Sequence, residues 1–362
     1  MPSDKRFLVL EGSPKERGLI HGETLRPMIL EVIERVKYSL RKNYGSNPER
    51  LIDRFVKETD FIAAVRKLSP HLLDEVEGIS EGAGVDFNTI FFLQCMDEQW
   101  WWFPESISKL EARGCSTIGS FRKDESPALL AQNMDIPNMF QGLDVLLHIK
   151  HRDSLESYVY TFAGLIALCG VNNRPVGICC NTLIDMNHCT EGYPVAFIVR
   201  SVLEQSNLEE AIKFVRGFKH ASGQNYTIGD FEEVISLECS AGKISRFVPY
   251  EGARRVYHTN HPLANDDIVV PPMKRMGTGT SHARFAYLAG RLRDPTVNIT
   301  PETIRYILSS HEGPVCVHNN NQPGGGYTFG SLVYILSKPP ELHLARGPPC
   351  QTEYEIYSFT RV

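Results

Sequence analysis

The chain has 362 residues, of which 42% are hydrophobic, 10% aromatic and 22% charged. This composition is that of an ordinary globular protein, and it excludes a chain that is mainly disordered or fibrous. Lys and Arg together number 38 against 43 Asp and Glu, for a net charge of −5. The chain therefore lacks the positive excess of a nucleic-acid-binding protein.

The N-terminus and the cysteines indicate where the protein works. Residues 7–10 are the first apolar run, which is too short for a secretory signal, and no later run approaches the roughly 18 apolar residues of a membrane span. The nine cysteines are scattered through the chain, as is typical of reduced thiols and not of a secreted disulfide framework. We expect a cytoplasmic protein without a membrane partner.

The N-terminal third predicts mostly helix. Apolar residues recur at helical spacing over 22–44 and more weakly over 51–67. A helix over 70–83 begins at a proline and ends in a glycine-rich stop. All three tryptophans follow at 100–102, and the polar stretch 104–113 has no period. This stretch predicts an exposed connector.

From Cys115 onward the pattern changes to short β-like runs. The predicted strands are 116–121, 129–132, 145–149, 157–162, 176–180, 234–237, 244–248, 256–259, 330–335, 342–345 and 354–359. Helices are predicted at 206–218, 281–292 and 300–308. A helical part followed by strands with interspersed helices favours an α+β sandwich over an alternating doubly wound sheet.

The sharpest local feature is the pair Gly114-Cys115, where the connector ends. It is the only Gly-Cys pair in the chain. Alone it is a weak signal, because an isolated cysteine is most often a small buried hydrophobe. Its position at the change of pattern and the polar motifs that follow strengthen it.

Those motifs give the chain a family resemblance. They are Gln132-Asn133-Met134-Asp135, Cys180-Asn181-Thr182, Ser222-Gly223-Gln224-Asn225-Tyr226, His258-Thr259-Asn260-His261 and Ser281-His282-Ala283-Arg284. In this order and spacing the chain resembles the acyl-coenzyme A:6-aminopenicillanic acid acyltransferase family (peptidase C45 type), whose relatives include conjugated bile acid hydrolases and penicillin V acylases. The resemblance covers nearly the whole chain. It implies a four-layer αββα sandwich of the N-terminal-nucleophile hydrolase type, with a mainly helical N-terminal segment.

The resemblance also implies self-cleavage between Gly114 and Cys115. The products would be an α chain, 1–114, and a β chain, 115–362, which together form one structural unit. The thiol would convert the preceding amide into a thioester that water cleaves, with the hydroxyl of Thr117 as a possible aid. Cleavage frees an α-amine with a pKa of about 7.7 to 8.0, so the nucleophile and its base belong to one residue and no histidine is needed.

The family assigns further roles to polar residues of the motifs. Asp135 would hold the charged amine, Asn260 and Asn181 would donate to the developing oxyanion, and Arg284 would brace the site. Without the resemblance, a turn-forming Asp, satisfied buried amides and a solvated helix Arg would be the ordinary interpretation. Gln132 stands where bile acid hydrolases have an arginine, which weakens any inference of an anionic substrate.

We expect no metal and no cofactor. Cys179 and Cys180 with His188 and Cys189 could suggest zinc, but adjacent strand residues point to opposite faces and the spacing fits no usual ligand pattern. There is also no Gly-x-Ser-x-Gly motif of a serine hydrolase.

These observations predict a hydrolase or acyltransferase. Cys115 would attack a small-molecule linear amide or thioester, and water or an amine would take the acyl group, with hydrolysis slightly favoured. An uncleaved Cys–His thiol hydrolase using His258 or His261 is one alternative. A non-catalytic binding relative of the family is another.

Overall fold

The structure is a computed structural model that describes residues 6–103, 114–151, 153–269, 279–318 and 325–359. The predicted connector 104–113 lies outside these ranges. Within them, every helix is too short or too polar to cross a membrane.

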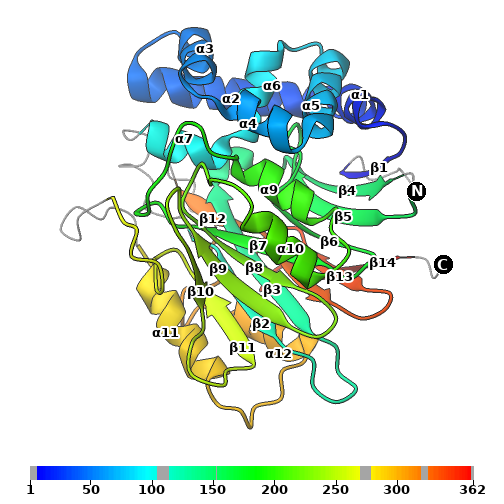
Figure 1. The fold of residues 1–362 in the computed structure, drawn as a ribbon, viewed down its shortest axis with the longest axis vertical. Coiled ribbons are helices and arrows are strands. Elements are labelled where there is room, and N and C mark those ends of the chain that lie inside the picture. The colour runs from blue at the N-terminus through cyan, green and yellow to red at the C-terminus, as the bar shows by residue number, and fades with distance from the viewer. Residues whose placement is uncertain (1–5, 104–113, 152, 270–278, 319–324, 360–362) are drawn as a thin grey trace.

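A layer of helices forms one end of the molecule (Figure 1). Its members are α1 Pro14–Thr24, α2 Arg26–Tyr44, α3 Pro48–Glu58, α4 Phe61–Leu68, α5 Pro70–Ala83, α6 Phe87–Gln94 and α7 Met96–Trp102. The helix predicted over 22–44 is divided at Leu25, because Arg26-Pro27 starts a new helix there. The helix predicted over 70–83 has the expected bounds, with Gly84 in the left-handed conformation as its cap.

Glycines bring α1 and α5 into backbone contact. A Cβ on Gly18 would lie 2.0 Å from the carbonyl oxygen of Glu75, and one on Gly22 would lie 2.4 Å from that of Ile79. Gly78 and Gly82 show the same crowding from the other helix. Only hydrogen fits between the helices at these four positions, so the helical layer is closely packed.

Two sheets make up the rest of the molecule. The first runs in the order β1-β4-β5-β6-β7-β8-β9-β10, and the second in the order β11-β2-β3-β12-β13-β14. The strands are β1 Phe7–Leu10, β2 Ser116–Ser120, β3 Leu129–Pro137, β4 Asp144–Lys150, β5 Glu156–Phe162, β6 Cys169–Asn172, β7 Gly177–Thr182, β8 Gln224–Gly229, β9 Val234–Cys239, β10 Ile244–Phe247, β11 Arg255–His258, β12 Gly326–Ile335, β13 Glu341–Ala345 and β14 Glu355–Ser358.

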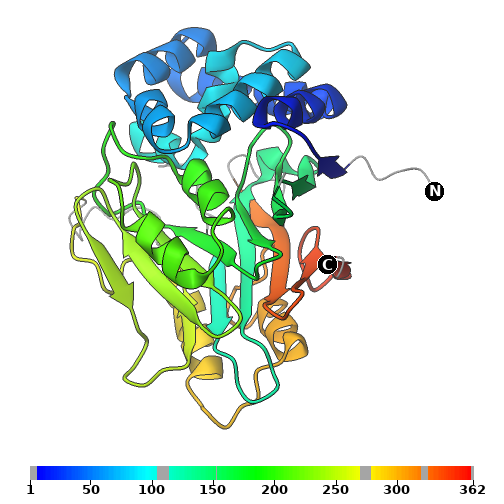
Figure 2. The ribbon, with the colours of Figure 1, turned by 45° about the vertical axis from the view of Figure 1, so that its right-hand side comes forward.

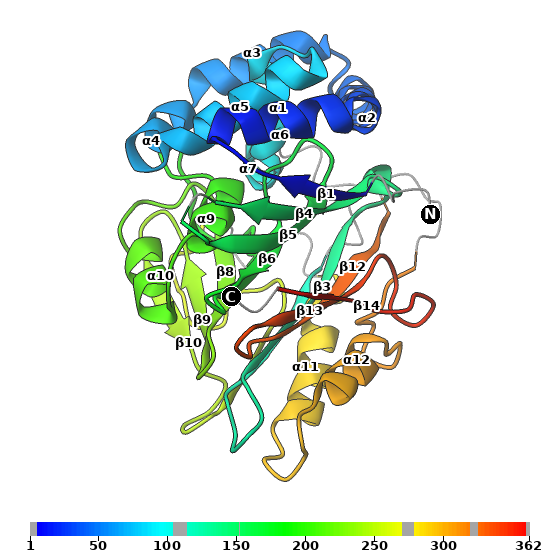
Figure 3. The same cartoon turned by 90° about the vertical axis from the view of Figure 1, so that its right-hand side faces the viewer.

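The sheets pack face to face, with helices on both outer sides. β2 and β3 lie against β7 and β8, which joins the two sheets. Helices α9 Val195–Val202 and α10 Leu208–Val215 cover the first sheet, and α11 Ser281–Leu292 and α12 Pro301–Leu308 cover the second (Figure 3). Figure 2 shows the helical layer above both sheets. The predicted four-layer αββα sandwich with a helical N-terminal segment is confirmed.

Two elements show what hydrophobic patterning missed. α9 is buried at every position, Arg200 and Ser201 included, so it has no exposed polar face, and its eight residues are mostly apolar. β3 was predicted to end at Gln132 but continues to Pro137 through the buried polar residues Asn133 and Asp135. Polar side chains inside a strand hide it from a search for apolar runs, and these two lie beside the predicted nucleophile.

Candidate active site

Gly114 and Cys115 lie directly before β2, which lies between the edge strand β11 and β3 in the second sheet. β2 pairs antiparallel with β3, with Ser116 opposite Asn133. This register brings the end of β3 beside the predicted nucleophile, and the negative charge of Asp135 acts on the pKa of the Cys115 thiol. Gly114 is buried and Cys115 is half-buried.

Arg284 joins the residues around the Gly114–Cys115 bond. Its guanidinium is fully buried. Nη1 donates to the carbonyl oxygen of Cys115 at 2.7 Å and to the hydroxyl of Ser116 at 3.1 Å, and Nη2 donates to Oδ1 of Asn260 at 3.1 Å. Nε donates to Oγ1 of Thr280 at 2.9 Å. Arg284 is therefore a buried cation held by four neutral acceptors, and it is not a solvated residue of α11.

The absence of a side chain at Gly114 makes room for this guanidinium. A Cβ on Gly114 would lie 1.7 Å from Nη2 of Arg284 and 2.4 Å from Cζ. These separations are far below van der Waals contact, so any larger residue would displace Arg284. The glycine of the Gly-Cys pair is therefore required by Arg284, which lies 170 residues further along the chain.

Asn181, at the end of β7, is the second donor to the same carbonyl. Its Nδ2 donates to the oxygen of Cys115 at 2.9 Å. Its Oδ1 accepts from Oγ1 of Thr117 at 3.0 Å and from Nδ2 of Asn225 at 2.9 Å. Thr117 also accepts from the hydroxyl of Thr227 at 3.2 Å. Thr117 therefore orients an amide of the site.

Asn260 lies on the other side of Arg284. Its Nδ2 donates to the carbonyl oxygen of Thr182 at 3.1 Å, and its backbone N–H donates to the hydroxyl of Ser281 at 2.8 Å. In this uncleaved chain the side-chain amide of Asn260 is therefore hydrogen-bonded to other groups of the protein. The structure brings all seven predicted site residues into one connected region: Gly114, Cys115, Thr117, Asp135, Asn181, Asn260 and Arg284.

Burial sets the protonation of the nucleophile and the carboxyl group. It raises the pKa of the Cys115 thiol to about 12, with the negative charge of Asp135 adding to the effect. It also raises the pKa of Asp135 to about 7, although the charge of Arg284 and a 2.7 Å hydrogen bond from Thr328 oppose the rise. Near neutral pH the thiol is protonated and Asp135 is poised to gain or lose a proton.

The two histidines of the alternative mechanism have other partners. Nε2 of His258 lies 2.8 Å from Glu238, and Nδ1 lies 2.6 Å from the carbonyl oxygen of Thr259. Nδ1 of His261 lies 2.7 Å from the hydroxyl of Ser281, and burial lowers the pKa of this imidazole to about 4. Among the described residues, neither ring has a hydrogen bond to Cys115.

Sequence reasoning gave no role in the site to several residues that hold it, although two of them, Asn225 and Ser281, lie within the quoted motifs. They are Ser116, Asn225, Thr227, Ser281 and Thr328. Each is a small polar residue on a strand or at a helix start, and such residues usually serve turns and caps. The run of polar residues in Ser222–Tyr226 was a usable signal, since β8 begins within it.

Gln132, which stands where bile acid hydrolases have an arginine, lies within the site. Its Nε2 donates to the carbonyl oxygen of Cys180 at 2.7 Å, and the amide lies near the Cys115 thiol, whose pKa it lowers. A neutral amide thus faces the thiol, while the positive charge near the nucleophile comes from Arg284. Arg284 lies in the first turn of α11.

The tryptophans lie beside the helical layer. Trp101 stacks on His188 with 4.2 Å between ring centroids and donates to the hydroxyl of Ser222 at 2.9 Å. Trp102 meets Phe55 edge-on at 5.6 Å. Both are half-buried, and they belong to the contact between this layer and the sandwich.

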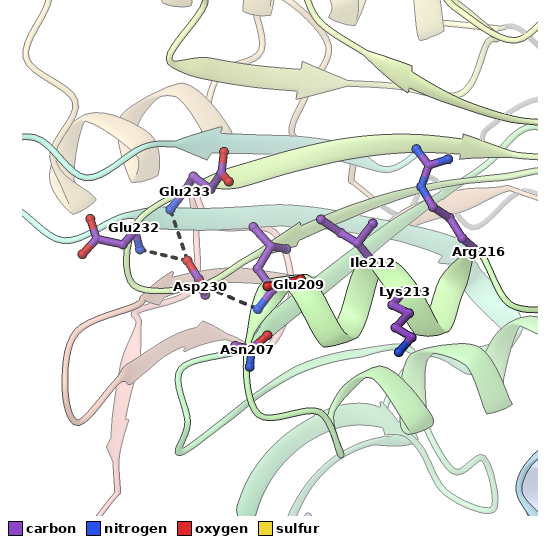
Figure 4. Close-up of a pocket in the computed structure, with 9 residues that line it drawn as sticks. Asn207, Glu209, Ile212, Lys213, Arg216, Asp230, Glu232 and Glu233 are labelled. Carbon is purple, nitrogen blue, oxygen red and sulfur yellow. Dashed lines mark hydrogen bonds between the residues drawn. The ribbon is translucent and has the colours of Figure 1, made fainter.

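A surface hollow lies elsewhere, between the start of α10 and the turn joining β8 and β9 (Figure 4). Its lining includes Glu209, Lys213, Asp230 and Glu233. None of the residues that line it belongs to the Cys115 region. Its lining offers exposed charges and no thiol.

The cysteines considered for zinc are separate from the residues that could hold a metal. Cys179 and Cys180 are buried on β7. Instead, ligand atoms of His311, Cys316, His318 and Cys350 all lie within 4.8 Å of one another. The short pattern His-x4-Cys-x-His was a signal in the sequence, but its fourth member is more than 30 residues away.

Known proteins provide an independent comparison. The family described as acyl-coenzyme A:6-aminopenicillanic acid acyl-transferase matches residues 121–337, which is more than half of the chain. The chain belongs to this family. By this description, the members of the family are acyl-transferases.

One curated relative and several solved structures are similar to this family member. Protein dcd1A of Dictyostelium discoideum is 24% identical over 244 residues, which cover 58% of this chain and 53% of the relative. The chain therefore spans about half the length of that relative.

Among solved structures, a mutant of conjugated bile acid hydrolase from Clostridium perfringens is 13% identical, with a TM-score of 0.46 over 68% of this chain and 98% of that one. Penicillin V acylase from Agrobacterium tumefaciens is 12% identical, with a TM-score of 0.38 over 68% of this chain and 87% of that one. These are the two kinds of relative that the sequence resemblance names.

Proposed function

We propose that this acyltransferase-family enzyme is a self-processing cysteine N-terminal-nucleophile amidohydrolase. The observation that supports it best is the convergence of Arg284, Asn181 and Asp135 on Cys115, the residue that follows the proposed cleavage bond. Two donors hold the carbonyl of Cys115 at 2.7 and 2.9 Å, and a buried carboxyl group lies beside its sulfur. Such positioning is what an intramolecular attack requires.

Self-cleavage would begin with the sulfur of Cys115 attacking the carbonyl carbon of Gly114. The thiol proton passes to ionised Asp135, whose pKa of about 7 suits a proton acceptor near neutrality. The C–N bond breaks, the nitrogen of Cys115 takes a proton, and Gly114 is left as a thioester on the sulfur. Water then hydrolyses the thioester, which frees the thiol and gives Gly114 a carboxylate.

The mature enzyme would use the new α-amine of Cys115 as its base. Asp135 would hold this amine when it becomes charged, by a charge-assisted hydrogen bond. The thiol attacks an acyl amide or thioester, and the acyl group moves to the sulfur as the leaving amine or thiol departs. Water or an amine then takes the acyl group and restores the free thiol.

The side-chain amides of Asn260 and Asn181 would donate hydrogen bonds to the oxyanion that forms in this reaction. Each such donor is worth about 2.7 to 4 kcal/mol of barrier. Arg284 holds Oδ1 of Asn260 and Thr117 holds Oδ1 of Asn181. Both amides therefore present their N–H groups on the side away from these partners, and we propose Arg284 and Thr117 as their positioning residues.

The two products of cleavage would remain one unit. Leu72 and Ile29 of the helical layer share a single apolar core with Leu146 and Phe197 of the sandwich. Residues 1–114 and 115–362 would thus stay associated as the α and β chains. We propose that they act in the cytoplasm on a small-molecule substrate.

The experiment is a panel of acyl amides and acyl thioesters offered to the wild type and to Cys115→Ala. We expect release of amine or thiol by the wild type and its complete loss in Cys115→Ala. Cys189→Ala, which removes another half-buried thiol, is the control and should keep the activity. Turnover by Cys115→Ala at the wild-type rate would contradict the proposal.

A further inference from the structure

A group of four metal-binding side chains lies beyond the end of α12. His311, Cys316 and His318 come from the segment that follows this helix, and Cys350 comes from the turn after β13. Their ligand atoms all lie within 4.8 Å of one another. Two thiols and two imidazoles from two distant segments thus meet at one point.

Their separations are close to those around a tetrahedral zinc ion. Bonds of about 2.3 Å to sulfur and 2.0 to 2.1 Å to nitrogen place the ligand atoms roughly 3.3 to 3.8 Å apart. Here Cys316 Sγ and Cys350 Sγ are 3.5 Å apart, and Cys350 Sγ and His318 Nε2 are 3.2 Å apart. His311 Nε2 and His318 Nε2 are 3.0 Å apart. Shifts of a few tenths of an ångström would bring these three pairs to the tetrahedral values.

Hydrogen bonds alone explain the cluster poorly. Thiols are weak donors and weak acceptors, and two neutral imidazoles can share only one proton between them. A single cation, in contrast, accepts a lone pair from all four groups at once. A disulfide between Cys316 and Cys350 would leave the two histidines unexplained.

We propose that His311, Cys316, His318 and Cys350 bind one Zn²⁺ ion as a structural site. A set of two thiolates and two imidazoles is typical of zinc, and four protein ligands leave no open position for substrate. Binding would release the two thiol protons to solvent as the Zn–S bonds form. The ion would fasten the segment after α12 to the C-terminal turn.

The site would also stabilise the surroundings of Asp135. Val317, which lies between two of the ligands, donates its N–H to Oγ1 of Thr328 at 2.9 Å, and its carbonyl accepts the N–H of Thr328 at 2.9 Å. The same hydroxyl of Thr328 donates to Asp135 at 2.7 Å. Zinc would thus fix the segment that aligns Thr328 with the carboxyl group of the active site.

Metal content and a cobalt spectrum test the proposal. The experiment uses the Cys115→Ala chain, so that the proposed nucleophile cannot bind the metal and failure of the proposed function does not affect the outcome. After growth with added Zn²⁺ and dialysis, we expect one zinc per chain by elemental mass spectrometry. Replacement with Co²⁺ should give thiolate charge-transfer absorption and the strong visible bands of tetrahedral cobalt.

Variants at the exposed ligands give the decisive comparison. Cys350→Ala and His311→Ala change exposed residues, so the chain should fold and yet lose at least ten-fold in zinc affinity. Cys189→Ala and His71→Ala remove a thiol and an imidazole elsewhere and should keep one zinc per chain. Less than a tenth of a zinc per chain with both thiols reduced, a Cys316–Cys350 disulfide in the peptide map, or wild-type zinc content in Cys350→Ala would overturn the proposal.

Discussion

Two buried carboxyl groups of this protein, those of Glu75 and Asp135, differ in the number of guanidinium groups around them and in their proposed roles. Glu75 on α5 accepts from Arg17 at 3.2 Å and from Arg200 at 3.3 Å, with side-chain exposures of 1%, 4% and 0% for the three residues. Asp135 is equally enclosed but has the charge of Arg284 as its main opposing influence. The first group ties the helical layer to α9, and the second lies beside the proposed nucleophile.

Their pKa values move in opposite directions. Burial raises the pKa of Glu75, but the charges of Arg200 and Arg17 outweigh it and the net shift is downward. Burial raises the pKa of Asp135 to about 7, because Arg284 compensates only in part. Two guanidiniums fix a charge permanently, whereas one leaves a carboxyl group able to exchange a proton near neutral pH.

Breaking the cluster around Glu75 should have the largest effect on stability. Glu75→Gln leaves Arg17 and Arg200 buried without their counter-charge, which should lower the free energy of unfolding by about 3–5 kcal/mol. Urea unfolding of the uncleaved Cys115→Ala chain measures it. Glu77→Gln on the same helix is the control: Glu77 is 54% exposed and lies 3.5 Å from Lys15, so its loss should cost less than about 1 kcal/mol. Equal midpoints for the two variants would refute the role of Glu75.

Displacing Arg284 should have the next largest effect. Gly114→Ala puts a methyl group where Nη2 of Arg284 now lies, and a displacement of about 1 Å at such a site costs about 10²-fold in rate, or about 2.7 kcal/mol. We expect self-cleavage to slow by that factor when the fraction of cleaved chain is followed by gel. Gly290→Ala on α11 is the matched control, since its Cβ would meet nothing within 4 Å. Wild-type cleavage in Gly114→Ala would contradict the proposed geometry.

The pH dependence of stability distinguishes the two carboxyl groups by sign. The raised pKa of Asp135 gives stability that is complete below its ordinary value of 3.8 and is lost as pH rises to about 7. Asp135→Asn should remove this loss, which is at most about 1.4 kcal/mol per pH unit. The lowered pKa of Glu75 gives the opposite behaviour, with stability lost as pH falls below its ordinary value of 4.5. Urea unfolding at several pH values in the Cys115→Ala chain measures both differences, and slopes of the same sign would refute the comparison.

The hydroxyl of Thr328 should have the smallest effect. Its hydrogen bond lowers the pKa of Asp135. Asp135 costs stability over a pH range, here called the Asp135 window, that ends at about pH 7. Thr328→Val should move the upper end of this window upward by about one pH unit, or about 1.4 kcal/mol. Thr328→Ser keeps a hydroxyl and should leave the window in place. The same unfolding series reports both variants. An equal shift in the two variants would show that the hydrogen bond of the hydroxyl is not responsible.

The sequence predicted the layers of the fold because most of its elements have a one-sided apolar pattern. The helix over 70–83 is an example, and its bounds agree with those of α5. α9 escaped detection because it is buried on all sides. Packing of α1 on α5 depends on glycines whose spacing carries no hydrophobic signal.

The candidate site depended on the family resemblance more than on patterning. Order and spacing of motifs selected Asp135, Asn181, Asn260 and Arg284, which composition alone would have treated as ordinary polar residues. Thr328, which orients Asp135, was not predictable, because it reaches the site only through the pairing of β12 with β3. The His-Cys cluster was missed for the same reason, since Cys350 joins it through the fold.

The most direct test of the central claim is the intact mass of wild-type protein that turns over an acyl amide, combined with N-terminal sequencing. Our account predicts two fragments, 1–114 and 115–362, the larger of which begins with Cys115. Active protein that consists only of the full-length chain would contradict it.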